Sequence, residues 1–318
     1  MIQSIIVPEN GKVKNITSAQ LSDVKNKTFV WIDVEDPTEE DFEFLRKNFP
    51  LHPLASDPVF ESRLRPKIID FQQHLLLVFH EPLMEQGKLS FSRAIFFIGK
   101  DFLITVHNQS LPSIDAIKEL VNSSPKVLKK GSSFLVYDLL DQIVDNYFPI
   151  LDELDDEIDN LESKMFLRDG KDTLRKVFSL KRKILELKRK ISPVREVLSA
   201  LSRHESKIID KNALIYFRDV YDHAIRISDT IDIYRDLLTS ILEVHISLQS
   251  NKLNEVMKVL TVIATIMMPL TLITGFYGMN IVFPEVELFN ADSYFFILFL
   301  MLIVSGMLIM YFRKKKWL

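Results

Sequence analysis

The chain has 318 residues, and its 40 Lys and Arg against 43 Asp and Glu give a formal net charge of −3. Such a near-neutral chain lacks the basic face of a general nucleic-acid-binding protein, so we expect no nucleic-acid partner. It has no cysteine, which excludes disulfides, thiolate metal ligands and cysteine nucleophiles, and its eight glycines form no GxxxxGK(S/T) or GxGxxG motif, so we expect no nucleotide partner.

Residues 1–130 alternate short apolar segments with helical ones, which is typical of a small α/β domain. The predicted strands, rich in Ile, Val, Leu and Phe, are Gln3–Val7, Thr28–Val34, His74–His80, Arg93–Ile98 and Phe102–His107. Acidic residues directly after Pro37 predict the first turn of a helix. The fold class expected here is an α/β N-terminal domain followed by long helices.

Residues 131–210 predict an antiparallel helical hairpin with one acidic and one basic arm. The first arm, from Ser132 to about residue 166, carries seven acids between residues 152 and 162. The second arm, Lys171–Leu201, carries nine basic residues between residues 175 and 195. Two interpretations stay open: the arms pair with each other on a solvated surface, where single ion pairs are weak, or the acidic arm collects divalent cations.

Residues 211–276 predict one long stalk helix that continues into the membrane. Neither Pro nor Gly occurs between Asn212 and Met268, so an unbroken helix here would be roughly 80 Å long or more. A helix of that length needs partners to bury its apolar stripe, which predicts an oligomer. Four acids repeat every seven residues and so share one stripe, either facing solvent or facing a funnel: Asp222, Asp229, Asp236 and Glu243.

Two uncharged segments near the C-terminus are long enough to cross a lipid bilayer. Residues 259–276 and residues 294–312 each approach the roughly 20 helical residues that a span needs. The loop between them, residues 277–293, contains no Lys or Arg, whereas the tail, residues 313–318, begins Arg-Lys-Lys-Lys. The positive-inside rule then places both termini and the α/β domain in the cytoplasm, and the loop outside a plasma (inner) membrane.

Along one face of the helix that contains the first span, residues recur at steps of three and four: Asn254, Met257, Leu260 or Thr261, Ala264, Met268, Thr271 and Gly275. This spacing places the polar or small groups of Asn254, Thr271 and Gly275 at intervals along an otherwise apolar face. Polar groups inside a span usually face a bundle interior or water, so this face predicts either a pore with hydrophobic constrictions or a helix–helix seam with small residues. Spacing alone does not separate the two interpretations.

The first span is followed by Gly278, Met279 and Asn280, and this tripeptide resembles the signature of the CorA family of magnesium and cobalt transport proteins. A three-residue match is weak alone, but it stands at the outer end of the first of two C-terminal spans. Other segments similar to the family lie along the whole chain: Lys252 to Asn280, FRDVYDH at residues 217–223, WIDVEDP at residues 31–37, HPL at residues 52–54 and RPK at residues 65–67.

The resemblance implies a funnel-shaped homopentameric channel in a lipid bilayer that takes up Mg²⁺, with Co²⁺ or Ni²⁺ as further cargo. It implies a selectivity filter at Gly278, Met279 and Asn280, where the Gly278 carbonyl and the Asn280 side chain hold a hydrated ion. The residues of the exposed face listed above would line the pore, with Met257 and Leu260 as a hydrophobic gate. Glu243 matches a carboxylate at the cytoplasmic end of the pore.

The resemblance also implies a regulatory site for cytoplasmic Mg²⁺ at carboxylates shared between neighbouring protomers. Asp57, Asp141 and Asp219 match that cluster. One departure from the family pattern is Pro58, which stands where a second adjacent carboxylate is expected. Helix caps or ordinary surface charges are the alternative interpretation of these three acids.

Two other functions compete with a magnesium channel. A zinc-selective relative of the ZntB type would resemble Gly-Ile-Asn at the motif, whereas this chain has Met279. A membrane-anchored scaffold without conduction explains the two spans and the stalk but not the polar face or the motif. An enzyme is not expected, because the seven histidines show no metal-ligand spacing such as HExxH.

Overall fold

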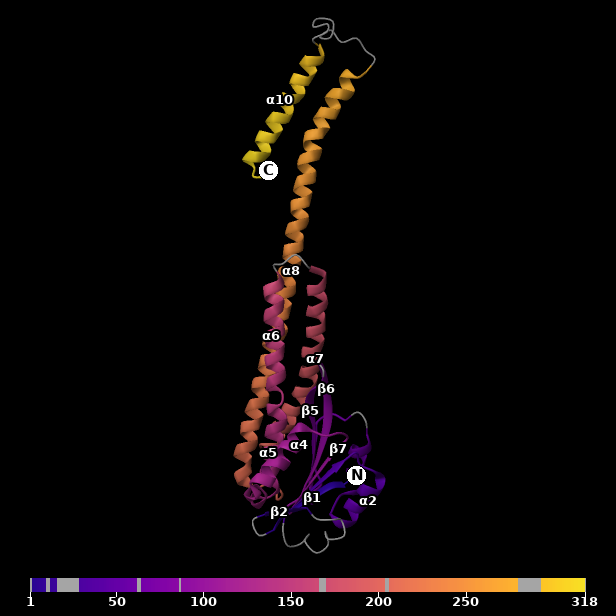
Figure 1. Cartoon of the computed structure of the whole chain (residues 1–318), viewed down its shortest axis with the longest axis vertical. Helices are drawn as coiled ribbons and strands as arrows, with labels where there is room; N and C mark the ends of the chain where they lie inside the picture. Colours follow the sequence, from indigo (N-terminus) through magenta and orange to yellow (C-terminus); the bar gives the residue numbers. More distant parts are fainter. Residues whose placement is uncertain are drawn as a thin grey trace. The chain divides into compact units, whose positions relative to one another are not determined.

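The computed structural model describes residues 2–9, 12–15, 29–61, 64–85, 87–165, 170–203, 206–279 and 293–317. The chain forms two units, residues 1–241 and residues 242–318. The N-terminal unit contains a sheet with helices on both faces, and the C-terminal unit contains the end of a very long helix and one further helix (Figure 1). The expected α/β domain, long helices and two C-terminal apolar helices are therefore confirmed.

The sheet has seven strands in the order β2-β1-β3-β7-β6-β5-β4. Their bounds are Ile2–Glu9 for β1, Lys12–Asn15 for β2, Val30–Glu35 for β3, Lys67–Asp70 for β4, Leu75–Glu85 for β5, Lys88–Ile98 for β6 and Phe102–His107 for β7. Central strands β3 and β7 are parallel, and all other neighbours are antiparallel. Strand β7 begins and ends at the predicted residues.

The sequence reasoning missed two strands and cut three others short. Strands β2 and β4 are the two edges of the sheet and have only four residues each, of which two or three are charged or polar. Strand β1 extends beyond both predicted ends, Gln3 and Val7. Strands β5 and β6 form a longer hairpin than predicted, since Pro82 pairs with Phe91 well beyond the predicted end at His80. The predicted start at Thr28 lies outside the described residues, and β3 begins at Val30.

Successive residues of the central strands pack on opposite faces of the sheet, as the two-residue period requires. On one face, Leu76 and Val78 of β5 pack with α2 (Glu39–Asn48), η2 (Pro53–Ala55) and α3 (Asp57–Phe60). The opposite face, which includes Leu75, Leu77 and Phe79, packs with the helices that follow β7. The helices of both faces are thereby fixed to a single central sheet.

Helices α4 (Pro112–Ser123), η3 (Pro125–Lys130) and α5 (Ser132–Asp145) follow the sheet. The first arm of the predicted hairpin is divided, because α5 ends at Asp145 and α6 begins at Phe148. Pro149 explains this break, since proline lacks an N–H and clashes with the carbonyl four residues earlier, but is tolerated in the first turn of a helix.

Helices α6 (Phe148–Met165) and α7 (Gly170–Leu201) lie antiparallel, with Glu157 2.8 Å from Lys183. This is the one ion pair between the two arms among the described residues, so charge pairing contributes little to the hairpin. Buried apolar residues hold it together instead, and they are Leu154, Ile158 and Leu161 of α6 with Val177, Leu180, Ile184 and Leu187 of α7.

After η4 (Lys211–Ala213), helix α8 runs without interruption over Leu214–Tyr277, or about 96 Å at 1.5 Å per residue. Its N-terminal part packs beside α6 and α7, and Lys188 of α7 lies 2.5 Å from Asp232 of α8 (Figure 1). The last helix is α10 (Ser293–Lys314). Helix α8 and α10 each contain an 18-residue window apolar enough to cross a membrane, and only 6% of either window is buried within the chain.

Candidate functional site

The face of α8 that the sequence singled out is exposed in the single chain. Met257, Leu260 and Met268 are 51%, 57% and 73% exposed. The smaller or polar members of the face, Asn254, Ala264, Thr271 and Gly275, are exposed as well. Large apolar side chains facing outward over several turns indicate a surface that lipid or another copy of the chain covers.

Two shallow grooves run along this face and show that its residues are neighbours. A groove of about 400 Å³ is lined by Leu260, Ala264 and Met268. A second groove, of about 720 Å³, continues past Thr271 and Gly275 to Met279. The spacing of three and four therefore places these side chains on one face.

The threonine hydroxyls of this face use their protons on the helix itself. The Thr271 hydroxyl donates to the Met267 carbonyl at 2.8 Å, and the Thr261 hydroxyl donates to the Met257 carbonyl at 2.7 Å. With its proton engaged, each hydroxyl oxygen presents lone pairs outward as an acceptor. An acceptor of this kind suits the water shell of a cation, since those waters point their hydrogens away from the ion.

The last turn of α8 explains why the tripeptide begins with glycine. The Gly278 N–H donates to the Thr274 carbonyl at 2.9 Å, and a Cβ atom on Gly278 would lie only 2.8 Å from that same oxygen. A side chain at this position would clash with backbone, which cannot move aside easily. Met279 is 50% exposed, and Asn280 lies outside the described residues.

The four heptad acids, from Asp222 to Glu243, are all exposed on α8. Asp236 lies 3.1 Å from Arg235. Exposure in the single chain agrees with a solvated face, and it agrees equally with a funnel formed between copies. The role of Glu243 at the cytoplasmic end of a pore stays a prediction.

The three acids assigned to a regulatory site do not meet in one chain. Asp141 lies on α5, and its burial, then the charges of Asp145 and Asp219, raise its pKa. Asp57 begins α3, which packs on the opposite face of the sheet. A site containing all three would therefore combine residues of two copies, as the sequence predicted for neighbouring protomers.

Two side chains beside Asp141 were not singled out by the sequence analysis. Asp145, one helical turn further along α5, has Oδ1 3.5 Å from Nδ1 of His223 on α8, and Oδ1 of Asp141 lies 3.8 Å from the same nitrogen. Each of these three residues offers one possible ligand atom, and the three atoms lie within 4.8 Å of one another. The signal was present as two pairs at spacing i, i+4, Asp141 with Asp145 and Asp219 with His223, because that spacing puts both members on one helix face.

The electrostatics of this carboxylate cluster (Asp138, Asp141, Asp145 and Asp219, with His223) favour a cation. Burial, and then the charge of Asp141, raise the pKa of Asp138 to about 6. Burial, and then the carboxylates of Asp141, Asp138 and Asp219, raise the pKa of Tyr137 to about 12. Oδ1 of Asp141 and Nδ1 of His223 are buried without a hydrogen-bond partner. A divalent ion would satisfy these atoms, and an imidazole beside carboxylates suits Co²⁺ and Ni²⁺ as well as Mg²⁺.

Comparison with known proteins gives consistent matches. A protein-family model described as "CorA-like Mg2+ transporter protein" matches residues 26–314. The chain is 36% identical over 273 residues to "Cobalt/magnesium transport protein CorA" of Thermotoga maritima, covering 85% of this chain and 78% of that protein. It is 27% identical to the protein of the same name from Methanocaldococcus jannaschii, over the full length of both.

Solved structures agree with these matches. The complete structure of the CorA magnesium transporter from Methanocaldococcus jannaschii superimposes with a TM-score of 0.87 at 25% identity, and the match covers 100% of this chain and 99% of that one. The likeness therefore includes the long helix and the C-terminal helices as well as the sheet.

Proposed function

Because the chain belongs to the CorA-like Mg²⁺ transporter family, we propose that it carries Mg²⁺ through a membrane pore lined by the C-terminal half of α8. Co²⁺ and Ni²⁺ are its further proposed cargo. The observation that carries this proposal is the exposed row of small, polar and apolar side chains on α8, which runs from Asn254 to Gly275, close to the end of the helix at Tyr277. The outer ring and the hydrophobic gate of the proposed pore depend on that row.

A single copy of α8 cannot enclose a pore, so the channel is an oligomer, for which we propose a homopentamer. The exposed apolar side chains of α8 and α10 support this proposal, since both lipid and neighbouring copies can cover them. The basic residues in the last turn of α10 and directly after it support a cytoplasmic tail and a cytoplasmic N-terminal unit.

At the outer mouth, a ring of Gly278, Met279 and Asn280 is proposed to hold the ion with its water shell. Mg²⁺ gives up its inner waters reluctantly, so neutral oxygen acceptors in a ring bind it through water. The backbone contact of Gly278 with Thr274 supports a role in shaping this ring, because only glycine fits there. Asn280 supplies the side-chain carbonyl, and Met279 packs.

Below the ring, the ion passes Thr271 and then a hydrophobic gate formed by Met257 and Leu260. Both gate residues are large, apolar and exposed, so copies of them around an axis would exclude water and close the pore. The driving force is the inside-negative potential. A divalent ion gains about 4.6 kcal/mol per 100 mV, enough for roughly a thousandfold accumulation.

Regulation is proposed at the carboxylate cluster, completed by Asp57 of a neighbouring copy. Bound Mg²⁺ would offset the repulsion between the clustered carboxylates and hold adjacent copies together with the pore shut. When internal Mg²⁺ falls, the acids repel one another and the population shifts toward the open state. Asp145 and His223 add ligands to this site and offset the carboxylate that is missing at Pro58.

The direct test is Mg²⁺ flux into liposomes that contain the purified protein, with a negative internal potential. We expect Asn280→Ala to abolish flux while the oligomer stays intact, and the matched control Asn290→Ala, in the same loop, to retain it. Flux through Asn280→Ala equal to that of the wild type would contradict the ring, and absence of divalent flux from a verified oligomer would favour the scaffold.

The sensor is tested by the same flux at low and high internal Mg²⁺. We expect flux to fall as internal Mg²⁺ rises, and the double variant Asp141→Asn, Asp219→Asn to remain active at high internal Mg²⁺. Flux indifferent to internal Mg²⁺ in the wild type would retain the pore and reject the sensor.

A further inference from the structure

A large cavity lined by basic side chains lies in the N-terminal unit, outside the proposed pore and the carboxylate cluster. It has a volume of about 1430 Å³ and is formed by the β5–β6 hairpin, the segment before β4, and α7. Its basic members, here called the basic cavity, are Arg65, His80, Arg93, Lys188, Arg189 and Lys190. None of the described residues that line it is Asp or Glu.

Two of these cations are fixed by contacts with the protein. The Arg93 guanidinium donates to the backbone carbonyls of Glu61 and of Val59, the latter at 2.8 Å. Lys188 donates to Asp232 at 2.5 Å and to the Ser228 hydroxyl at 3.0 Å. These contacts hold both walls of the cavity in place.

Three other cations have no such acid partner. Within the part of the chain that the structure describes, Arg65, Arg189 and Lys190 form no ion pair. Lys190 lies over the Phe91 ring, 5.2 Å from its centre, and burial lowers the pKa of Lys190 while the charge of Glu186 opposes that shift. Positive charge is thus concentrated in a partly enclosed space, where it is worth more than at an open surface.

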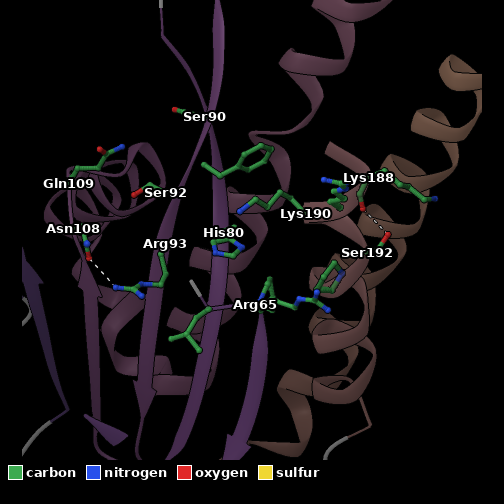
Figure 2. Close-up of a pocket in the computed structure, with 15 residues that line it drawn as sticks. Arg65, His80, Ser90, Ser92, Arg93, Asn108, Gln109, Lys188, Lys190 and Ser192 are labelled. Carbon is green, nitrogen blue, oxygen red and sulfur yellow. Dashed lines mark hydrogen bonds between the residues drawn. The ribbon is translucent and has the colours of Figure 1, made fainter. Parts of the chain in front are cut away.

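His80 supplies a second, independent sign of a ligand site. This residue is 8% exposed, and its Nδ1 atom is buried with no hydrogen-bond partner among the residues that the structure describes. Burial, then the charges of Lys190 and Arg93, lower the pKa of His80 to about 4, so the ring is neutral near pH 7. Figure 2 shows His80 in the middle of the cavity, between Arg93 on one wall and Lys190 on the other.

We propose that the basic cavity binds a soluble polyphosphate anion, meaning two or more linked phosphate groups. Cations on two facing walls match an extended anion with several charges better than one phosphate, and the volume exceeds what a single phosphate would fill. Hydroxyls of Ser90 and Ser92 add neutral donors, the kind that surround phosphate oxygens in binding sites (Figure 2).

The site is tested by calorimetric titration of the full-length protein, purified in detergent and freed of divalent cations, with sodium tripolyphosphate. We expect the double variant Arg65→Gln, Lys190→Gln to bind at least tenfold more weakly than the wild type. The matched control is Lys126→Gln, Arg182→Gln, which removes the same charge from exposed positions outside the cavity and should bind like the wild type. If the double variant does not fold, Arg189→Gln, which alters an exposed side chain, replaces it.

Two results would overturn the proposal. The first is absence of binding of tripolyphosphate, pyrophosphate and ATP to the wild type, and the second is an equal loss in the cavity variant and in the control, which would indicate non-specific attraction. ATP and tripolyphosphate separate the two sources of the anion. If ATP binds more tightly than tripolyphosphate, and Phe91→Leu reduces the affinity for ATP to that for tripolyphosphate, the natural ligand is a nucleotide. If the two bind equally well, the site recognises the phosphate chain alone. None of these outcomes depends on transport.

Discussion

Large apolar side chains are buried in the N-terminal unit of this chain and exposed in the C-terminal unit. In the N-terminal unit, Phe79 and Phe96 are fully buried between sheet and helices. In the C-terminal unit, Met268, Leu272 and Met310 are 72–73% exposed. The difference shows that the first unit completes its core within one chain, whereas the second unit leaves a large apolar surface, which we proposed above to be covered by lipid and by other copies of the chain.

The contrast holds for polar groups as well. Asp33, buried in the sheet, receives contacts from His107 at 3.0 Å and from Lys118 at 2.6 Å. On α8, in contrast, Thr271 bonds only to its own helix and presents its oxygen outward. Substitutions in the first unit should therefore change folding stability, and substitutions in the second unit should change transport and assembly.

Core truncation gives the largest expected effect. Phe96→Ala should lower the free energy of unfolding of the N-terminal unit by about 3–5 kcal/mol, because it removes a large buried ring and leaves a cavity. The matched change Met268→Ala should leave that value within about 0.5 kcal/mol, since the side chain is 73% exposed. Urea unfolding in detergent, followed by the fluorescence of Trp31 in a Trp317→Phe background, measures the first unit alone. Equal losses from both changes would break the comparison.

The buried Asp33 network gives the next largest effect. Asp33→Asn should cost about 3 kcal/mol, because it removes the negative charge that contacts the buried His107 and the half-buried Lys118. The exposed control Asp101→Asn should be near neutral. Both are measured by the same unfolding experiment.

The pH dependence of this loss has a definite sign. Burial alone would lower the pKa of His107, but the hydrogen bond and charge of Asp33 raise it above its usual value. The stability that this contributes is present below the unfolded pKa of about 6.5 and is lost as the pH rises through the folded pKa. The cost of Asp33→Asn should therefore be larger at pH 6 than at pH 9, and a cost that grows with pH would contradict the assignment.

The carboxylate cluster at Asp141 lies in the N-terminal unit, but we proposed above that a neighbouring copy of the chain completes it. The pKa of Asp138 is raised to about 6 and that of Asp141 is raised by burial, so protons compete with cations there. Co²⁺ affinity should fall about tenfold between pH 7.0 and pH 5.5, although carboxyls with the usual pKa of about 3.9 would stay ionised at both. Titration calorimetry measures this, and the step should vanish in Asp141→Asn. If the fall in Co²⁺ affinity between pH 7.0 and pH 5.5 is unchanged in Asp141→Asn, the titrating group lies outside this cluster.

Sequence patterns predicted local features of this chain well. The apolar composition of Phe102–His107 and the absence of breakers before Met268 correctly predicted β7 and the long helix, since both depend on residues close in sequence. Edge strands β2 and β4 were missed because each has only four residues, two or three of them charged or polar, and pairing on one side tolerates such residues.

Contacts between distant segments could not be read from the sequence. Spacing put Asn254 to Gly275 on one face, but the meeting of Asp145 with His223 depends on how α5 packs against α8. The basic cavity was missed for the same reason, since Arg65, His80 and Lys190 come from three separate segments. Each of these sites results from tertiary packing, which the local patterns leave undetermined.

The smallest effect expected compares two threonines that bond to backbone. Thr38 caps α2 by accepting from the Asp41 N–H at 3.2 Å, while the Asp41 carboxylate accepts from the Thr38 N–H at 3.1 Å, a reciprocal capping box. Thr38→Ala should cost about 1 kcal/mol of N-terminal stability. Thr271→Ala should cost nothing by the Trp31 readout and instead lower Mg²⁺ flux, because its oxygen faces the proposed pore. Burial alone would raise the pKa of Asp41, but its hydrogen bonds to Thr38 hold that pKa below its usual value. The stability that these bonds contribute is lost once the carboxylate takes up a proton, so part of the Thr38→Ala effect should disappear as the pH is lowered toward 3. Destabilisation of the N-terminal unit by Thr271→Ala with flux intact would contradict the separation of stability and transport between the two units.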